Sequence, residues 1–291
     1  MDTQENTQDL GTEQTDSKEL WRMAGVKNKV DTVVSLGGNV RFVWILASCT
    51  VLLAALLFLL IPNPNPAIQK LFIKGDYVVA SSGEDAIFYA SGHKESKIQL
   101  PFEPTSISYD GINIAISSVS KGKISVLDKQ GKQIDDMDIA SPFCVSYLSE
   151  RLFLATPSEV SSFKRVKWDA PNYKRCVALV GTYDPIIVDY DGFYSLDGSG
   201  SFVAHPFMGK AMAVCAGMKG SDIIVGFNDL TFAVYSPADG KKIEEGKLPP
   251  WVTKEFVISG DSVACSYNST LRIGKMTESK PQFEGDAWEG K

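Results

Sequence analysis

Histidine is scarce in this sequence, and the short motifs that mark common enzyme classes are missing. Its 291 residues include two histidines, His93 and His205, each in a turn-like context without a spaced group of Asp, Glu or His. A histidine that acts as a base or metal ligand needs such partners, so we interpret both as solvated loop residues. No nucleophile-elbow, phosphate-loop or dinucleotide-binding motif occurs. The sequence therefore predicts no enzymatic activity, no catalytic residues, no cofactor and no metal site.

Basic residues are outnumbered by acidic ones, 29 to 35, for a net charge of −6, and no basic cluster offsets this. Such a balance argues against a nucleic-acid partner. Cysteine is sparse as well, and no Cys-x-x-Cys pair occurs, which disfavours a zinc site. Beyond Cys49, which lies in an apolar run, disulfide pairing and burial as free thiols both remain open for Cys144, Cys176, Cys215 and Cys265.

Acidic groups recur at Asp110-Gly111, at 135–138 and at 189–192. Paired carboxylates can bind calcium or serve a glycosidase, but Asp-Gly is also common turn chemistry. Asp189 and Asp191 are the sharper candidates, because both would point to one face of an extended segment. We favour turn and solvation roles for all three groups.

One long apolar run, Phe42–Ile61, has twenty residues without charge or proline. At ~1.5 Å per residue, such a helix covers the ~30 Å hydrocarbon layer of a bilayer. The run follows Arg41 and ends at a Pro-Asn-Pro-Asn-Pro stretch that favours a stiff, extended linker over 62–69. We expect a transmembrane helix. Its membrane-spanning residues include Phe42, Trp44, Leu52, Leu60 and Ile61.

Two alternatives with cleavage fit this run less well. It is too long for a cleaved signal peptide, and 41 residues precede it. Leu46-Ala47-Ser48-Cys49 matches a bacterial lipoprotein pattern, but cleavage before Cys49 would leave an apolar mature N-terminus in place of the usual polar tether. We therefore expect an uncleaved signal anchor.

The flanking charges give the anchor a direction. Within about 20 residues of the run, more basic residues lie on its N-terminal side than on its C-terminal side: Arg22, Lys27, Lys29 and Arg41 against Lys70 and Lys74. This bias predicts a cytoplasmic N-terminus and a C-terminal domain in the periplasm, with a bacterial inner membrane favoured, or in the lumen or exterior of a eukaryote. Asn268-Ser269-Thr270 matches a glycosylation acceptor, which matters only in the eukaryotic case.

The tail before the anchor has two predicted parts. Residues 1–16 are acidic, rich in Gln and Thr and without hydrophobic period, which is typical of disorder. Residues 17–36 place apolar side chains at helical spacing, with Ser17 as N-cap and Gly37-Gly38 after the end. This amphipathic cytoplasmic helix either lies on the inner leaflet, docks on a partner or merely connects.

From Leu71 onward, short β-type runs alternate with Gly, Asp, Ser and Pro turns. A recurring motif, a turn followed by a few apolar β-forming residues, ends on a small residue at positions 80, 115, 155, 195, 226 and 264. A repeat as long as the spacing between these positions, with four short strands, has the size of one β-propeller blade. We predict an all-β fold, a β-propeller of about six four-stranded blades over 70–275, preceded by one transmembrane α-helix and the short amphipathic helix, and followed by a flexible tail over 276–291. A β-sandwich, the alternative, would need no such period.

Two hairpins, VLDKQGKQI at 126–134 and VYSPADGKKI at 234–243, resemble the Asp-x-x-x-Gly-Lys turns of the β-propeller superfamily, in particular its quinoprotein-like and WD-like repeats. The Trp-Asp dipeptide of WD repeats and the tryptophan docking pattern of quinoprotein blades are both missing, and residues 164–188 are the least regular part. The resemblance implies the architecture alone.

The leading functional hypothesis is a membrane-anchored, non-enzymatic protein-interaction scaffold in a multi-protein cell-envelope assembly of the secretion, conjugation or envelope-biogenesis type. Its expected partners are other membrane or periplasmic proteins and the lipid bilayer. The alternative is a propeller enzyme or ligand sensor, for example directed at glycans, with its site at the mouth of the central channel. Exposed aromatics on a flat face would favour binding. The candidates for such a surface are Trp168, Tyr173, Phe207 and Trp251.

Overall fold

The computed structural model describes Ser48 and residues 50–52, 66–149, 151–165, 167–209 and 211–288. The chain divides into two units, Met1–Pro64 and Asn65–Lys291. In the first unit, Ser48 and residues 50–52 are helical. Within the described residues, no helix is both long and apolar enough to cross a membrane. Apart from these four residues, the predicted span Phe42–Ile61 lies outside the described part, as do the two predicted segments of the tail, and all three stay predictions.

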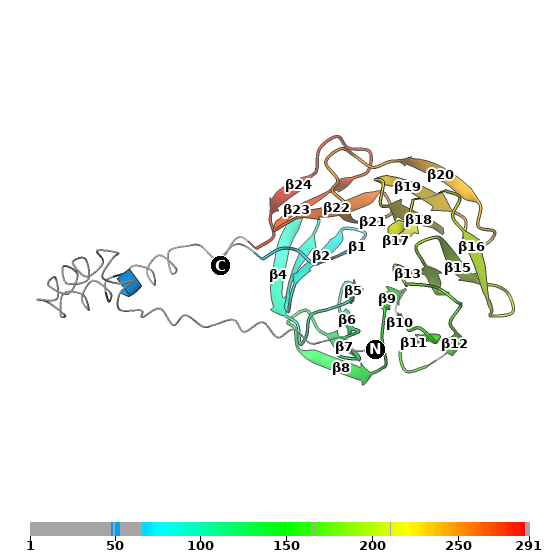
Figure 1. Cartoon of the computed structure of the whole chain (residues 1–291), viewed down its shortest axis with the longest axis horizontal. Helices are drawn as coiled ribbons and strands as arrows, with labels where there is room; N and C mark the ends of the chain where they lie inside the picture. The colour runs from blue at the N-terminus through cyan, green and yellow to red at the C-terminus, as the bar shows by residue number, and fades with distance from the viewer. Residues whose placement is uncertain are drawn as a thin grey trace, which may run out of the picture. The chain divides into compact units, whose positions relative to one another are not determined.

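The second unit is a ring of six antiparallel sheets, each built from four consecutive strands (Figure 1). The colour in Figure 1 passes around the ring from cyan to red, so the blades follow one another in chain order. The predicted β-propeller of about six four-stranded blades is confirmed, and the number of blades is six. Over residues 66–288, outside the few gaps, the structure contains strands and turns but no helix, as the alternating pattern indicated.

The first three blades contain β1 (Lys70–Lys74), β2 (Tyr77–Ser82), β3 (Asp85–Ala90) and β4 (His93–Gln99); β5 (Ser106–Tyr109), β6 (Ile114–Ser118), β7 (Lys123–Leu127) and β8 (Gln133–Asp138); β9 (Cys144–Leu148), β10 (Arg151–Ala155), β11 (Glu159–Ser162) and β12 (Lys167–Asp169). The other three contain β13 (Ala178–Val180), β14 (Ile186–Val188), β15 (Gly192–Leu196) and β16 (Phe202–Pro206); β17 (Ala213–Lys219), β18 (Asp222–Phe227), β19 (Thr231–Tyr235) and β20 (Lys242–Lys247); β21 (Glu255–Ser259), β22 (Ser262–Tyr267), β23 (Thr270–Lys275) and β24 (Phe283–Asp286).

The first strand of each blade is the innermost one, and innermost strands of adjacent blades contact each other all around the ring. β1 of the first blade contacts β21 of the last, so the ring closes by packing, without a strand exchanged between blades. Two backbone hydrogen bonds support the junction, from Ile68 N to Asn268 O at 2.8 Å and from Ala287 N to Ser269 O at 2.9 Å. Ile68 and Ala287 are buried in one cluster with side chains of both blades.

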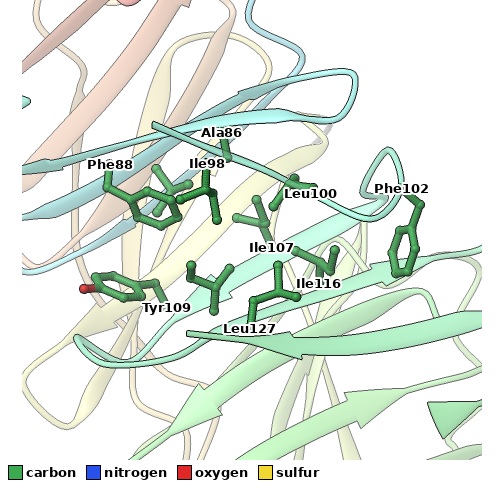
Figure 2. Close-up of a cluster of buried hydrophobic side chains, with 11 residues drawn as sticks. Ala86, Phe88, Ile98, Leu100, Phe102, Ile107, Tyr109, Ile116 and Leu127 are labelled. Atoms are coloured by element: carbon green, nitrogen blue, oxygen red, sulfur yellow. The ribbon is translucent and has the colours of Figure 1, made fainter. Parts of the chain in front are cut away.

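Apolar side chains fill the space between blades. Figure 2 shows the cluster between the first two blades, in which Phe88 of β3 meets Tyr109 of β5 with ring centroids 5.4 Å apart. Phe102, from the connector between these blades, belongs to the same cluster. A proline followed at once by an aromatic residue recurs in such connectors, at Pro101-Phe102, Pro142-Phe143, Pro206-Phe207 and Pro250-Trp251.

Five of the six recurring small residues lie on the second strand of a blade, not on the innermost strand. Ala80, Ala115, Ala155 and Ala264 have no exposed surface. At Gly226, an added Cβ would lie 2.4 Å from Cε2 of Phe256 in the next blade. Small side chains are therefore required by packing between blades, rather than by crowding at the ring axis.

The fourth predicted copy of the motif, which ends at Ser195, does not lie on the second strand of its blade. Its small residue, Ser195, lies on β15, the third strand of the blade. The true second strand is β14, which has three residues and pairs with the equally short β13. Because Ile186–Val188 contains no small residue, the recurring motif is absent from this strand and could not reveal it.

The propeller also extends beyond its predicted end at Lys275. β24, the outer strand of the last blade, lies within the 276–291 stretch that was predicted as a tail. Phe283 on β24 packs against Tyr89 of the first blade, with ring centroids 5.5 Å apart. The few polar residues after Lys275 form a turn that masked this strand in the sequence.

Candidate functional site

The two faces of the ring carry different loops, because all six blades share one strand order. One face, which we call the connector face, carries the segments that lead into the innermost strands and the turns between second and third strands. The opposite face carries the remaining turns. A central cavity of 980 Å³ lies between the innermost strands.

The lining of this cavity carries more positive than negative side chains. Among the described residues that line it, four are cationic, Lys70, Lys74, Lys174 and Arg175, and one, Glu255, is a carboxylate. Lys74 Nζ donates to the backbone oxygen of Tyr147 at 3.1 Å. Burial lowers the pKa of the Lys74 ammonium, an effect that the charge of Asp110 partly opposes. A paired-carboxylate centre of the glycosidase type is therefore not formed by these residues.

Asp189 is buried and organises one sector of the connector face. Its side chain accepts three backbone N–H groups, from Lys174 at 2.8 Å, Arg175 at 3.1 Å and Tyr190 at 2.7 Å. Only 1% of the Asp189 surface is exposed. A buried carboxylate that accepts three backbone N–H groups holds two loops together, which agrees with the favoured turn role.

Tyr190 and Asp191, the two residues after Asp189, each bond to a side chain of the connector that contains Lys174 and Arg175. Asp191 Oδ2 accepts from Lys174 Nζ at 2.8 Å, and this hydrogen bond lowers the pKa of the Asp191 carboxyl. Arg175 Nη1 donates to the Tyr190 hydroxyl at 2.7 Å, and its guanidinium lies 5.7 Å from the centroid of the Tyr190 ring. One exposed cation is thus held beside an aromatic ring.

The connector before β17 is fastened to the same turn at both ends. Phe207 N donates to Asp191 O at 2.8 Å, and Ala213 N donates to Tyr190 O at 2.9 Å. Between these bonds, 86% of the Met208 surface and 50% of the Met212 surface are exposed. Arg175, Tyr190 and Val214 line the cavity, and the connector that carries Met208 and Met212 is hydrogen-bonded at both ends to the Tyr190–Asp191 turn. We call these five residues the blade-four patch.

This patch has the chemistry of a protein-binding surface. Exposed methionines adapt their shape to different apolar partners, and Tyr and Arg are enriched where interfaces carry their binding energy. The hydrogen bonds beneath the patch hold its two connectors in place, which lowers the entropy lost on binding.

The four aromatic residues predicted to form a surface all pack against neighbouring groups, with Trp251 buried and the other three half-buried. Trp168 stacks on Phe153 with ring centroids 6.1 Å apart, and 9% of the Trp251 surface is exposed, with Nε1 donating to Glu278 O at 3.0 Å. Tyr173 donates its hydroxyl to Thr156 O, and burial raises its pKa. Their contribution to binding stays a prediction.

Phe207 and Tyr173 nevertheless belong to this sector. The Phe207 ring packs on Tyr235 and Phe227, with centroids 5.1 Å and 5.5 Å away, and so fixes the start of the 207–213 connector. Tyr173 directly precedes Lys174. Phe207 and Tyr173 therefore lie in the connectors that carry Met208 and Arg175, and the surface role predicted for both stays a prediction.

His93 is exposed at the first residue of β4, as predicted for a solvated histidine. For His205 the prediction was wrong, because it lies on β16 and stacks on Phe193 at 4.7 Å between centroids. His205 Nε2 is 2.9 Å from Ser195 Oγ, which itself donates to Pro237 O at 2.8 Å. A carbonyl can only accept, so the single Ser195 proton points away from His205 and the imidazole is the donor. This serine–histidine pair is not arranged as nucleophile and base.

The other acidic groups have structural partners. Asp110 Oδ1 accepts from Ile112 N at 2.7 Å and from Asn113 N at 2.6 Å, which is a turn role. In the 135–138 group, Asp135 pairs with Lys164 of the next blade, and Asp136 pairs with Lys123 at 3.0 Å. Among the described residues, no group of three or more His, Cys, Asp or Glu side chains could hold a metal ion.

No protein-family model and no curated protein matches this sequence. Solved structures do match. The WD40 domain of Neurospora crassa Pan2 aligns with a TM-score of 0.53 and 13% identity, over 74% of this chain and 77% of that one. The β-propeller domain of Cps50 (Swd1) from Myceliophteria thermophila aligns with a TM-score of 0.51 and 10% identity, over 76% and 89%. The chain is a six-bladed β-propeller, and its fold is similar to those of these two β-propeller domains, so the resemblance noted in its hairpins is confirmed as one of architecture.

Proposed function

We propose that this chain is a membrane-anchored, non-enzymatic protein-interaction scaffold, a subunit of a multi-protein cell-envelope assembly. The blade-four patch carries the proposal, because it displays Met208, Met212 and an Arg175–Tyr190 pair on connectors that are hydrogen-bonded beneath. A fold shared with WD40 domains supports a scaffold role of this general type. The expected partner is another envelope protein that inserts a partly apolar, acidic segment.

Binding accounts for the patch and the cavity better than catalysis does. The cavity lining has one carboxylate among four cations in the described residues, which suits attraction of an acidic segment. Ser195, whose hydroxyl is hydrogen-bonded to His205, directs its proton to a carbonyl. No observation favours the glycan-directed enzyme that the sequence left open.

The membrane part of the proposal rests on the sequence. Phe42–Ile61 has the length and composition of a bilayer-spanning helix, and the basic residues before it favour a cytoplasmic N-terminus. The propeller would then lie in the periplasm, with a bacterial inner membrane favoured.

A pull-down from alkali-washed membranes, dissolved in mild detergent, tests both parts. The tagged full chain should stay with the washed membranes and recover a partner that mass spectrometry identifies. M208E with M212E should lose that partner by at least about tenfold, because charges at the centre of an interface cost well over 1.4 kcal/mol. Y183E is the matched control, since Tyr183 is 78% exposed on the opposite face.

Three results would count against the proposal. Loss of the chain from washed membranes removes the anchor. Recovery of the chain alone at stoichiometric purity removes the assembly. Equal partner recovery by M208E/M212E and wild type moves the interface away from the blade-four patch.

A further inference from the structure

Cys144 and Cys176 lie next to each other at the wall of the central cavity, where the third and fourth blades meet. Cys144 is the first residue of β9, and Cys176 lies in the connector before β13. Cys144 Sγ is 3.2 Å from the backbone oxygen of Cys176. Both side chains belong to one buried cluster, with 5% and 6% of their surfaces exposed, and both line the cavity.

The two thiol groups also interact directly. Burial raises the pKa of the Cys176 thiol well above its usual range, and the hydrogen bond to the Cys144 side chain raises it further. Cys215 and Cys265 differ, because burial is the main cause that raises the pKa of each thiol and no second thiol is among the other causes. Of the four cysteines in the described propeller, Cys144 and Cys176 alone form a thiol pair.

We propose that Cys144 and Cys176 form a disulfide that joins the third and fourth blades when the domain folds in an oxidising compartment or meets a disulfide oxidant. One thiolate of the pair attacks a sulfur of the oxidant, such as oxidised glutathione, and releases one glutathione thiol. The other thiolate then attacks the mixed disulfide at the protein sulfur and releases a second. The two protein thiols lose two protons and two electrons, and the oxidant becomes two thiols.

The bond would stabilise the sector that carries the blade-four patch. It closes a loop between residues 32 positions apart, and it fixes the connector that includes Lys174 and Arg175. A disulfide that closes a loop of this length should raise Tm by about 5–10 °C in a propeller of this size, because it restricts the unfolded chain.

Peptide mapping of the full chain in detergent, after incubation of the folded protein with oxidised glutathione, tests the pair. Free thiols are alkylated in denaturant before trypsin digestion. We expect a disulfide-linked product of peptides 133–151 and 176–210, whereas peptides 211–219 and 255–272, which contain Cys215 and Cys265, are alkylated. Oxidation should raise Tm in wild type and in the matched control C215S, but not in C144S or C176S.

Several outcomes overturn the proposal: alkylation of Cys144 and Cys176 after oxidation, a link that involves Cys215 or Cys265, or a bond that forms and lowers Tm. The experiment uses no partner, so its result is independent of the proposed scaffold function.

Discussion

Gly226 shows how a single residue can be dictated by a neighbouring blade. A Cβ added there would lie 2.4 Å from the Phe256 ring and 2.9 Å from Cys215 Sγ. The backbone of β18 can therefore approach β21 only if position 226 has no side chain. The sequence pattern of small residues detected this position correctly, although the reason lies in contacts between blades.

We expect G226A to reduce the free energy of unfolding by about 1–3 kcal/mol, because the added methyl overpacks the space between the fifth and sixth blades. G198A is the control, since nothing lies within 4 Å of a Cβ at Gly198, and it should change stability by less than about 0.5 kcal/mol. Urea unfolding measures both. Equal effects of the two variants would contradict the packing explanation.

At the scale of elements, the sequence reveals some strands and connectors and misses others. The alternation of apolar residues and turn residues predicted the second strand of five blades. They failed where β13 and β14 shorten to three residues each. The Pro-aromatic pairs of the connectors were an available signal, at Pro206-Phe207 for example, and would have indicated the segment that carries Met208 and Met212.

Asp189 provides the prediction at this scale. D189A should destabilise the protein by about 2–4 kcal/mol, because three backbone N–H groups lose their acceptor. D191A removes only the exposed pair with Lys174, which has 76% and 63% side-chain exposure for Lys174 and Asp191, and should cost less than about 1 kcal/mol. Denaturant unfolding measures both losses. A larger loss in D191A than in D189A would show that the salt bridge, rather than the buried carboxylate, holds the connector.

At the scale of the whole molecule, the ring depends on the junction between its first and last blades. Tyr89 lies in that junction, with its hydroxyl donating to Ala287 O at 3.3 Å and its ring against Phe283. Burial raises the pKa of Tyr89 to about 12. The native fold therefore favours the neutral phenol over the ionised one.

This shift predicts a pH-dependent contribution to ring stability. An unfolded tyrosine ionises near pH 10, so the unfolded chain releases the proton first as pH rises. The stability that Tyr89 contributes is complete below about pH 10 and is lost as the pH approaches the folded value of about 12. The stability advantage of wild type over Y89F, measured by urea unfolding, should shrink between pH 8 and pH 11. A constant difference across this range would contradict the prediction.

What the sequence alone determined is local. The alternation of strands and turns and the spacing of the small residues predicted a propeller of about six blades, because period-two burial and turn chemistry are features of consecutive residues. The tertiary structure fixed the number at six. The site is different. Asp189, the 174–175 connector and Met208 come together, and Cys144 meets Cys176 across 32 positions, only when separate blades pack side by side. Such contacts have no fixed spacing along the chain, so the tertiary structure alone decided them.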